Sequence, residues 1–187
     1  MKYLVWFSLF SIILAAACGK NEFEQPKPPE KKGNVQMKAL VETSMGDFTI
    51  EFYHEDAPNT VDNFVKLSEK GFYDGLTFHR VVKGFVIQGG DPRGNGTGGP
   101  GYTIAAEFNG RPHLLGTVAM ARGPDINSAG SQWYVCLDKI AQLDGKYTVF
   151  GQVTEGVDVV KKIGEVKVDN TDKPLEPVTI NRITIQK

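Results

Sequence analysis

The chain holds 187 residues, of which 41% are hydrophobic and 23% charged, with a formal net charge of -1. This length suits one domain of ordinary size, because domains most often hold about 100 to 150 residues. The nearly neutral charge balance excludes a strongly basic protein that attracts nucleic acid through its net charge, so we expect no nucleic-acid partner.

The first residues have the pattern of an export signal. Lys2 precedes an unbroken apolar run from Tyr3 to Ala17, and the run ends in small residues. A transmembrane helix takes about 20 apolar residues, so this run is short for one. We therefore expect residues 1–17 to be a signal peptide that takes no part in the fold.

Cys18 stands where such a signal would be cleaved. It follows Leu14-Ala15-Ala16-Ala17, which resembles the lipobox of bacterial lipoproteins, although leucine is usual at the position of Ala15. The three alanines also fit ordinary signal cleavage, which would give a soluble periplasmic or secreted protein. Because a cysteine follows the cleavage position, we expect Cys18 to be lipidated and to anchor the protein to a membrane of the cell envelope.

A tether and one folded domain are expected after the signal. Residues 18–37 are rich in proline and charge and offer almost nothing to bury, so they should be disordered. The domain then spans residues 38–187. If Cys18 is acylated, Cys136 has no partner for an internal disulfide, and its apolar neighbours in WYVCL favour a small buried side chain.

The domain opens with a predicted hairpin and helix. ALVETS and DFTIEFY alternate apolar and polar residues around a Met45-Gly46 turn, which is typical of a β-hairpin with one buried face. A helix is predicted from Pro58, which the first helical turn tolerates, to the stop at Gly71. The apolar residues at helical spacing in this segment are Val61, Phe64, Val65 and Leu67.

The rest of the domain is mostly strand. Strand-like runs separated by glycine-rich turns are FHRVV, FVIQG, GTVAMA, QWYVCL and YTVFGQV. A short helical stretch, VDVVKKIGEV, precedes a last strand, VTINRITIQ. About eight strands and two helices predict a mainly β fold, either a closed antiparallel barrel with helices at its open ends or a sandwich.

The glycine-rich run from Gly94 to Gly99 formally matches the dinucleotide-binding pattern G-x-G-x-x-G. That motif needs a helix to begin directly after the glycines, whereas Pro100-Gly101 follows here and no helical periodicity begins. A nucleotide-dependent enzyme is therefore not supported. We interpret the run as a loop that needs positive φ angles and a close backbone approach.

No side chains with the usual machinery of bond cleavage are visible. His54, His79 and His113 lack the spacing of metal ligands, so we expect no metal and no cofactor. His79 next to Arg80 could be a general base, but adjacent residues of a strand point to opposite faces and cannot line one site. A guanidinium, an amide and several apolar side chains remain, which suits a reaction without bond cleavage.

Three blocks of the sequence resemble the cyclophilin family of peptidyl-prolyl cis/trans isomerases. They are FHRVVKGFVIQGGDPRGNGTGG, MARGPDINSAGSQWYV and LDGKYTVFG, and the resemblance covers residues 38–187. It implies a mainly β fold, a closed eight-stranded antiparallel barrel capped by two helices. It also implies rotation about X-Pro bonds in proline-containing peptides and in unfolded exported proteins.

The resemblance also implies a site. Arg80 would be the catalytic residue, with Gln88 holding its guanidinium in place. The substrate proline would be surrounded or flanked by Phe85, Val86, Ala121, Arg122, Gln132, Tyr134, Leu143 and Tyr147. On residue type alone Phe85, Val86 and Leu143 fit a core as well as a pocket, but Arg80 and Gln88 are costly to bury in apolar strands unless they are used or paired.

The sequence departs from the family at three positions. Gln142 stands where many members have tryptophan, Val86 replaces the usual methionine, and Tyr147 stands where histidine is common. Without the indole we expect weak or no binding of cyclosporin. The alternative function is a peptide-binding or chaperone module in which catalysis is incidental, and the presence of Arg80 favours the enzyme.

Overall fold

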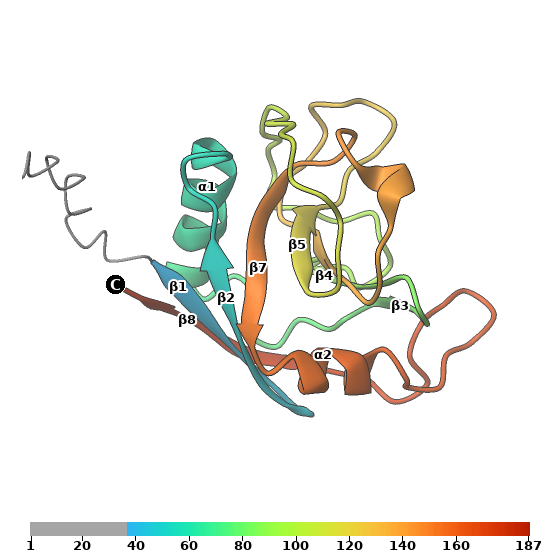
Figure 1. Cartoon of the computed structure of the whole chain (residues 1–187). Helices are drawn as coiled ribbons and strands as arrows, with labels where there is room; N and C mark the ends of the chain where they lie inside the picture. Colours follow the sequence, from blue (N-terminus) through green and yellow to red (C-terminus); the bar gives the residue numbers. More distant parts are fainter. Residues whose placement is uncertain (1–36) are drawn as a thin grey trace, which may run out of the picture. The chain divides into compact units, whose positions relative to one another are not determined.

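The computed structural model describes residues 37–187, so the predictions for the signal peptide, Cys18 and most of the tether lie outside the described residues. The described strands are β1 (Lys38–Thr43), β2 (Gly46–Phe52), β3 (Arg80–Val82), β4 (Val86–Gly89), β5 (Thr117–Met120), β6 (Trp133–Cys136), β7 (Val149–Glu155) and β8 (Ile180–Gln186). The helices are α1 (Pro58–Glu69) and α2 (Val157–Ile163), and a 3-10 turn, η1, spans Ala141–Leu143 (Figure 1). Within residues 37–187, no helix has the length and apolar character needed to cross a bilayer.

The eight strands form one antiparallel sheet in the order β3-β4-β6-β5-β7-β2-β1-β8. The predicted fold class, number of strands and pair of helices are thereby confirmed. The closed barrel is not confirmed, because β3 and β8 end the sheet without pairing with each other. The sheet curls instead, and a few backbone hydrogen bonds join its ends, including Phe78 N to Val178 O at 3.0 Å and Ile180 N to Leu76 O at 2.7 Å.

The predicted hairpin and first helix are confirmed. β1 pairs with β2 from Lys38 opposite Glu51 to Thr43 opposite Gly46, and alternate residues of β1 are buried. Helix α1 ends at Glu69, and Gly71 follows two residues later with a φ of 67°. Gly71 N donates to Ser68 O at 2.9 Å and Phe72 N to Leu67 O at 3.0 Å. This pair of bonds is a Schellman motif, which uses the last carbonyl groups of a helix and favours glycine at the left-handed position.

Two apolar clusters lie on opposite faces of the sheet. On β6, Trp133 and Val135 join the main core, whereas Tyr134 and Cys136 join a smaller second cluster. Neighbouring residues of a strand point to opposite faces, so a strand with both faces covered is buried throughout, as β5 and β6 are. Phe64 of α1 packs edge-on against Trp133 in the main core, with ring centroids 5.7 Å apart. The second cluster is the face that carries the candidate site.

Candidate active site

Strand pairing places the most polar of the predicted site residues in one row across the sheet. Arg80 on β3 lies opposite Gln88 on β4, Gln88 lies opposite Tyr134 on β6, and Tyr134 lies opposite Ala119 on β5. Directly opposed residues of antiparallel strands point to the same face with Cβ atoms about 5 Å apart. The row therefore sets one cation, one amide and one aromatic ring side by side.

The predicted apolar residues meet beside this row, in the second cluster. Val86 and Tyr134 are 2% and 4% exposed and form part of its buried floor. The other predicted residues that pack on the floor are partly buried: Phe85, Ala121, Leu143 and Tyr147. Leu143 belongs to η1, which follows β6 in the chain. This short turn therefore packs on the second cluster and forms one side of the pocket. Val86 is thus a core residue beneath the pocket as much as a pocket residue.

Gln88 binds another amide instead of the guanidinium of Arg80. Its Nε2 donates to Oε1 of Gln132 at 3.0 Å, and Nε2 of Gln132 donates to Gly96 O at 3.0 Å and to Gly98 O at 2.8 Å. Among residues 37–187 no hydrogen bond joins Gln88 to Arg80, so the support of the guanidinium by Gln88 stays a prediction. The two amides instead connect the row to the glycine-rich loop.

The glycine-rich loop is organised around the carboxylate of Asp91. Its oxygens accept hydrogen bonds from the backbone N-H groups of Arg93 at 2.8 Å and Asn95 at 3.0 Å, and from Gly96. Burial by itself would raise the pKa of Asp91, but these donors outweigh burial and hold the pKa below its usual value. Gly96 has φ of 86°, and a Cβ on Gly98 would overlap the Asp91 carboxylate. The interpretation of this run as a loop that requires glycine is confirmed.

Arg80 has a neighbour that the sequence did not indicate. Its Nε lies 3.5 Å from Oδ2 of Asp172, and the two side chains are 38% and 44% exposed. The backbone N-H of Val81, next to Arg80, donates to Asp172 O at 2.8 Å. The guanidinium is therefore held at the edge of the sheet, partly exposed to solvent and beside the row.

His79 lies directly before β3 and is buried, whereas the Arg80 side chain is partly exposed. His79 is 6% exposed, and neither ring nitrogen has a hydrogen-bond partner among the described residues. Burial lowers the pKa of His79, the charge of Asp91 opposes that shift, and the charges of Arg80 and Lys173 add to it. The lowered pKa favours the neutral imidazole, and burial keeps the ring from solvent, which argues against a role as general base.

Tyr134 is fixed from behind by two residues outside the predicted set. Its hydroxyl lies 3.0 Å from Nε2 of His113, whose Nδ1 lies 2.9 Å from Oδ1 of Asp144. The same carboxylate oxygen accepts the backbone N-H of His113 at 2.7 Å, and His113 is fully buried. Burial raises the pKa of the Tyr134 hydroxyl. The hydroxyl is thereby bound within the protein, and the ring is what Tyr134 offers to a substrate.

Arg122 and Tyr147 close one end of the pocket. The guanidinium carbon of Arg122 lies 4.8 Å from the centroid of the Tyr147 ring, which is a cation-π contact. Nη1 of Arg122 also donates to Gly123 O at 2.9 Å and Nη2 to Lys146 O at 3.1 Å. Arg122 thus ties the loop after β5 to the segment before β7. Tyr147 in turn meets Tyr134 edge-on, with centroids 6.0 Å apart.

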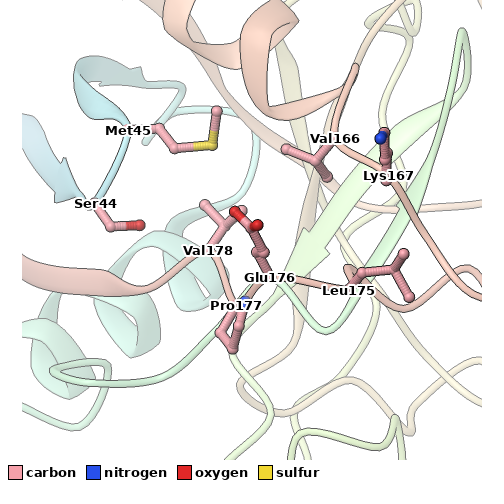
Figure 2. A pocket seen from close by; sticks show the side chains of 8 residues that line it. All are labelled: Ser44, Met45, Val166, Lys167, Leu175, Glu176, Pro177 and Val178. Carbon is pink, nitrogen blue, oxygen red and sulfur yellow. The ribbon is translucent and has the colours of Figure 1, made fainter.

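Two hollows lie at the surface of the described domain. One, of about 580 Å³, adjoins the row and is lined by Gln88, Ala121, Arg122, Gln132 and the glycine-rich loop. The other, of about 640 Å³, lies between the β1–β2 turn and two segments of the loop that joins α2 to β8, residues 166–167 and 175–178 (Figure 2). Its walls include Met45, Val166 and Leu175, and none of the predicted site residues lines it. The first hollow extends the candidate site, and the second is separate from it.

Some residues around the site could be predicted from the sequence, and others could not. Asp172, His113 and Asp144 were missed, because each is a polar residue in a loop whose partner comes from a distant segment. Burial raises the pKa of the Cys136 thiol to about 12, which fits the small buried side chain that was expected. In the described part of the chain no three His, Cys, Asp or Glu side chains gather as metal ligands.

Sequence comparison finds similar proteins that share one activity. The family model described as "Cyclophilin type peptidyl-prolyl cis-trans isomerase/CLD" matches residues 38–185. A peptidyl-prolyl cis-trans isomerase of Synechococcus elongatus is 52% identical over 128 residues, which are 67% of this chain and 88% of that protein. One of Arabidopsis thaliana is 45% identical over 154 residues, which are 79% of this chain and 93% of that protein.

Structural comparison agrees with the sequence. The crystal structure of a cyclophilin-type peptidyl-prolyl cis-trans isomerase of Cryptosporidium parvum matches with a TM-score of 0.78 and 30% identity. The match covers 81% of this chain and 98% of that chain. A crystal structure of the same protein in the presence of the dipeptide Ala-Pro matches with a TM-score of 0.77 and 31% identity, over 80% and 99% of the two chains.

Proposed function

Because the chain belongs to the cyclophilin family of peptidyl-prolyl cis/trans isomerases, we propose that it rotates X-Pro bonds at the row formed by Arg80, Gln88 and Tyr134. The observation that carries this proposal is the strand register. It sets a partly exposed guanidinium beside an aromatic and apolar pocket on one face of the sheet. That arrangement suits the binding of a proline ring next to a fixed hydrogen-bond donor.

The chemistry needs no proton transfer and no covalent intermediate. Rotation about a peptide bond has a barrier of about 18 to 20 kcal/mol because the nitrogen lone pair is delocalised into the carbonyl group. When the amide twists, the proline nitrogen regains its lone pair and becomes a better hydrogen-bond acceptor. An N-H of Arg80 directed at that nitrogen stabilises the twisted state more than the planar one, which is how binding energy lowers a barrier.

The pocket supplies the second requirement, a fixed proline ring. The rings of Phe85, Tyr134 and Tyr147 and the side chain of Leu143 give apolar contact, and the internal bond of the Tyr134 hydroxyl keeps its ring in place. The ring is held while the carbonyl group before it swings. Gln132, Ala121 and Arg122 border the adjoining hollow, where residues that precede or follow the proline would lie.

Proline-containing peptides are the proposed substrates, and unfolded exported proteins are the proposed clients. The crystal structure of the Cryptosporidium parvum relative in the presence of the dipeptide Ala-Pro is consistent with that substrate class. For the whole chain we propose a signal peptide at residues 1–17, a tether at 18–37 that begins with a lipidated Cys18, and the isomerase domain at 38–187. The pattern of residues 1–18 supports export and a membrane anchor.

The direct test is an isomerisation assay on an X-Pro peptide. We expect the wild type to accelerate cis/trans exchange and Arg80→Ala to lower kcat/KM by about 10²- to 10³-fold, the usual loss when one transition-state donor is removed. Arg182→Ala is the matched control, because Arg182 is exposed on β8 and outside the row. A wild type that leaves the exchange rate unchanged would refute the proposed activity.

The pH dependence separates this mechanism from general-base catalysis. We expect the isomerisation rate to be nearly flat between about pH 6 and 8, because a histidine acid or base would titrate near 6.5. Burial lowers the pKa of His79, so the neutral form of the ring is favoured more than in a free histidine. A rate that rises through pH 6.5 in the wild type and becomes flat in His79→Gln would restore the general-base mechanism.

The rival function is a peptide-binding or chaperone module in which catalysis is incidental. The same apolar pocket that holds a proline ring would hold an unfolded peptide without rotating it. Complementation of a strain that lacks the gene distinguishes the two. Full rescue by Arg80→Ala, in spite of its lost isomerase activity, would favour the module.

A further inference from the structure

The contact between Asp172 and Arg80 is made by a turn that is built in detail. The carboxylate of Asp169 accepts the backbone N-H of Thr171 at 2.8 Å, the Thr171 hydroxyl at 2.7 Å and the backbone N-H of Lys173 at 3.1 Å. Asp169 N also donates to Lys173 O at 2.8 Å. The turn therefore has a defined shape, and the bond from Val81 N to Asp172 O fixes it against β3.

The backbone of this turn does not account for the presence of an aspartate at position 172. Asp172 has φ of 65°, and it is the one non-glycine residue with a positive φ in the described range 37–187. A Cβ disfavours this left-handed conformation, whereas glycine adopts it freely, so glycine would suit the backbone better. A strained residue that the surroundings hold in place points to a role for its side chain. That side chain ends 3.5 Å from the Arg80 guanidinium.

The geometry of the contact leaves the end of the arginine available. Asp172 Oδ2 approaches Nε, the guanidinium nitrogen nearest the backbone. No hydrogen bond between residues in the described part of the chain engages Nη1 or Nη2 of Arg80. Gln88, which could have oriented the guanidinium, donates to Gln132 instead. Asp172 is thus the residue that can fix the plane of the guanidinium while its terminal N-H groups remain free for a substrate.

We propose that Asp172 is a positioning residue for Arg80, an inference that rests on the proposed isomerase function. Its carboxylate holds the guanidinium by Nε, so that the terminal N-H groups are already oriented when the proline nitrogen becomes an acceptor. A free arginine loses much rotamer entropy when it is held in one geometry. An arginine oriented beforehand loses less of that entropy in the transition state, so the contact should raise kcat more than it lowers KM.

The decisive variant is Asp172→Gly, which removes the carboxylate and relieves the backbone conformation. We expect kcat to fall about 2- to 5-fold, the range for a modest exposed charge pair, with KM nearly unchanged. The thermal unfolding midpoint should stay the same or rise. Asp172→Asn keeps the size and tolerates the left-handed conformation, so it should lose activity to a similar extent because it lacks the charge.

A control in the same turn separates positioning from folding. Thr171→Ala removes the hydroxyl that Asp169 accepts but leaves the Asp172 carboxylate in place. We expect this variant to lower the thermal midpoint with little change in kcat. The Arg80 Nε-H resonance in a nitrogen-15 NMR spectrum gives a readout independent of activity. It should shift in Asp172→Gly and stay in place in Thr171→Ala.

The possible results distinguish a failure of the positioning role of Asp172 from a failure of the isomerase function. If the wild type isomerises the peptide and Asp172→Gly matches its kcat, the positioning role is wrong and the isomerase function stands. The role is also wrong if Asp172→Gly still loses about 2- to 5-fold in the Arg80→Ala background, because Asp172 would then act without Arg80. A wild type without activity refutes the proposed function and this inference with it.

Discussion

At the scale of single residues, the candidate site depends on how its polar groups are held. The Tyr134 hydroxyl, the Gln88 amide and the Arg80 guanidinium each have an internal partner: His113, Gln132 and Asp172. None of these partners adds an apolar surface to the pocket. They fix the orientation of groups that a substrate would meet, and an oriented donor loses less rotamer entropy when it binds.

The bond between Tyr134 and His113 can be tested for its structural value. Tyr134→Phe would leave Nε2 of a fully buried histidine without a partner. We expect the free energy of unfolding to fall by about 1 to 3 kcal/mol, the cost of an unsatisfied buried polar atom. Urea denaturation at pH 7 measures it.

Isomerase activity of the folded Tyr134→Phe variant should stay close to that of the wild type, because the ring remains and the hydroxyl faces inward. Tyr147→Phe serves as a control, since the Tyr147 hydroxyl makes no hydrogen bond among the described residues. A Tyr134→Phe protein with wild-type stability but strongly reduced kcat would mean that the hydroxyl acts on the substrate.

Gln142 is the residue on which the response to cyclosporin should depend. It is exposed at the centre of η1, next to Leu143 of the pocket. Glutamine offers less apolar area than an indole and loses more rotamer entropy when it is held still. We expect weak or no inhibition of the wild type, and tighter binding in Gln142→Trp by about 1 to 3 kcal/mol, with little change in catalysis.

Titration of cyclosporin against both proteins measures this difference. Ala141→Trp is the matched control, because it adds the same indole at the neighbouring exposed position of η1. Equal affinities of wild type and Gln142→Trp would show that position 142 does not contact the drug. Nanomolar inhibition of the wild type would lead to the same conclusion.

At the scale of secondary-structure elements, helix α1 is completed by a residue far from it in sequence. Its N-terminus has no side-chain cap of its own, and Glu107 fills that place. The Glu107 carboxylate accepts the backbone N-H of Asn59 at 3.0 Å and of Thr60 at 2.8 Å. It also accepts the Asn59 amide at 2.8 Å and the Thr60 hydroxyl at 2.7 Å. A carboxylate at a helix N-terminus satisfies free N-H groups and interacts favourably with the helix dipole.

This cap predicts a pH-dependent stability. Burial by itself would raise the pKa of Glu107, but the Asn59 and Thr60 donors outweigh burial and lower it. A carboxylate with a lower pKa in the folded state stabilises the fold above its unfolded pKa, about 4.3. That stabilisation is lost as the pH falls through the folded pKa. Glu107→Gln should therefore cost about 1 to 2 kcal/mol at pH 7 and progressively less below about pH 4.

Urea denaturation of wild type and Glu107→Gln across this pH range is the measurement. Glu155→Gln, at an exposed glutamate of β7, controls for the loss of one surface charge. A stability difference that stays constant from pH 7 to pH 3 would show that the charge of Glu107 contributes nothing to the cap.

At the scale of the domain, the site lies on the face of the sheet opposite the main core. The main core holds Trp133, Phe64 and most of the other buried aromatic rings, and it includes most of the buried apolar residues. The second cluster is smaller and is covered by η1 and by the segment that leads to β7. Substrate-facing residues can therefore vary without disturbing the packing of the main core.

For the whole chain, the proposed anchor predicts a modified N-terminus. Mass spectrometry of the mature protein from its native envelope should find acyl chains on Cys18. More than one chain is expected, because a single chain gives only marginal membrane binding. Cys18→Ala should move the protein from the membrane to the soluble fraction with its isomerase activity intact. A free Cys18 thiol on a soluble wild-type protein would rule the anchor out.

The helices, the strands and the glycine-rich loop could be predicted from the sequence alone. The alternation of apolar residues predicted the strands, and helical spacing predicted α1 and α2. The run of glycines predicted a loop with positive φ angles. These features depend on residues that are close together in the sequence, so local sequence patterns are enough to predict them. The three motif blocks also carried the family and its activity, because motif residues keep their order along the chain.

The contacts between distant side chains could not be predicted in this way, because they depend on how the whole chain folds. A shift of one residue in strand pairing turns every side chain to the other face, so the row of Arg80, Gln88 and Tyr134 depends on a register that no local pattern states. Asp172 and Glu107 contact Arg80 and α1 because loops from distant segments are brought to them. Their own neighbours in sequence are ordinary turn residues. Such contacts depend on the fold of the whole chain, so they cannot be predicted from the sequence around each residue.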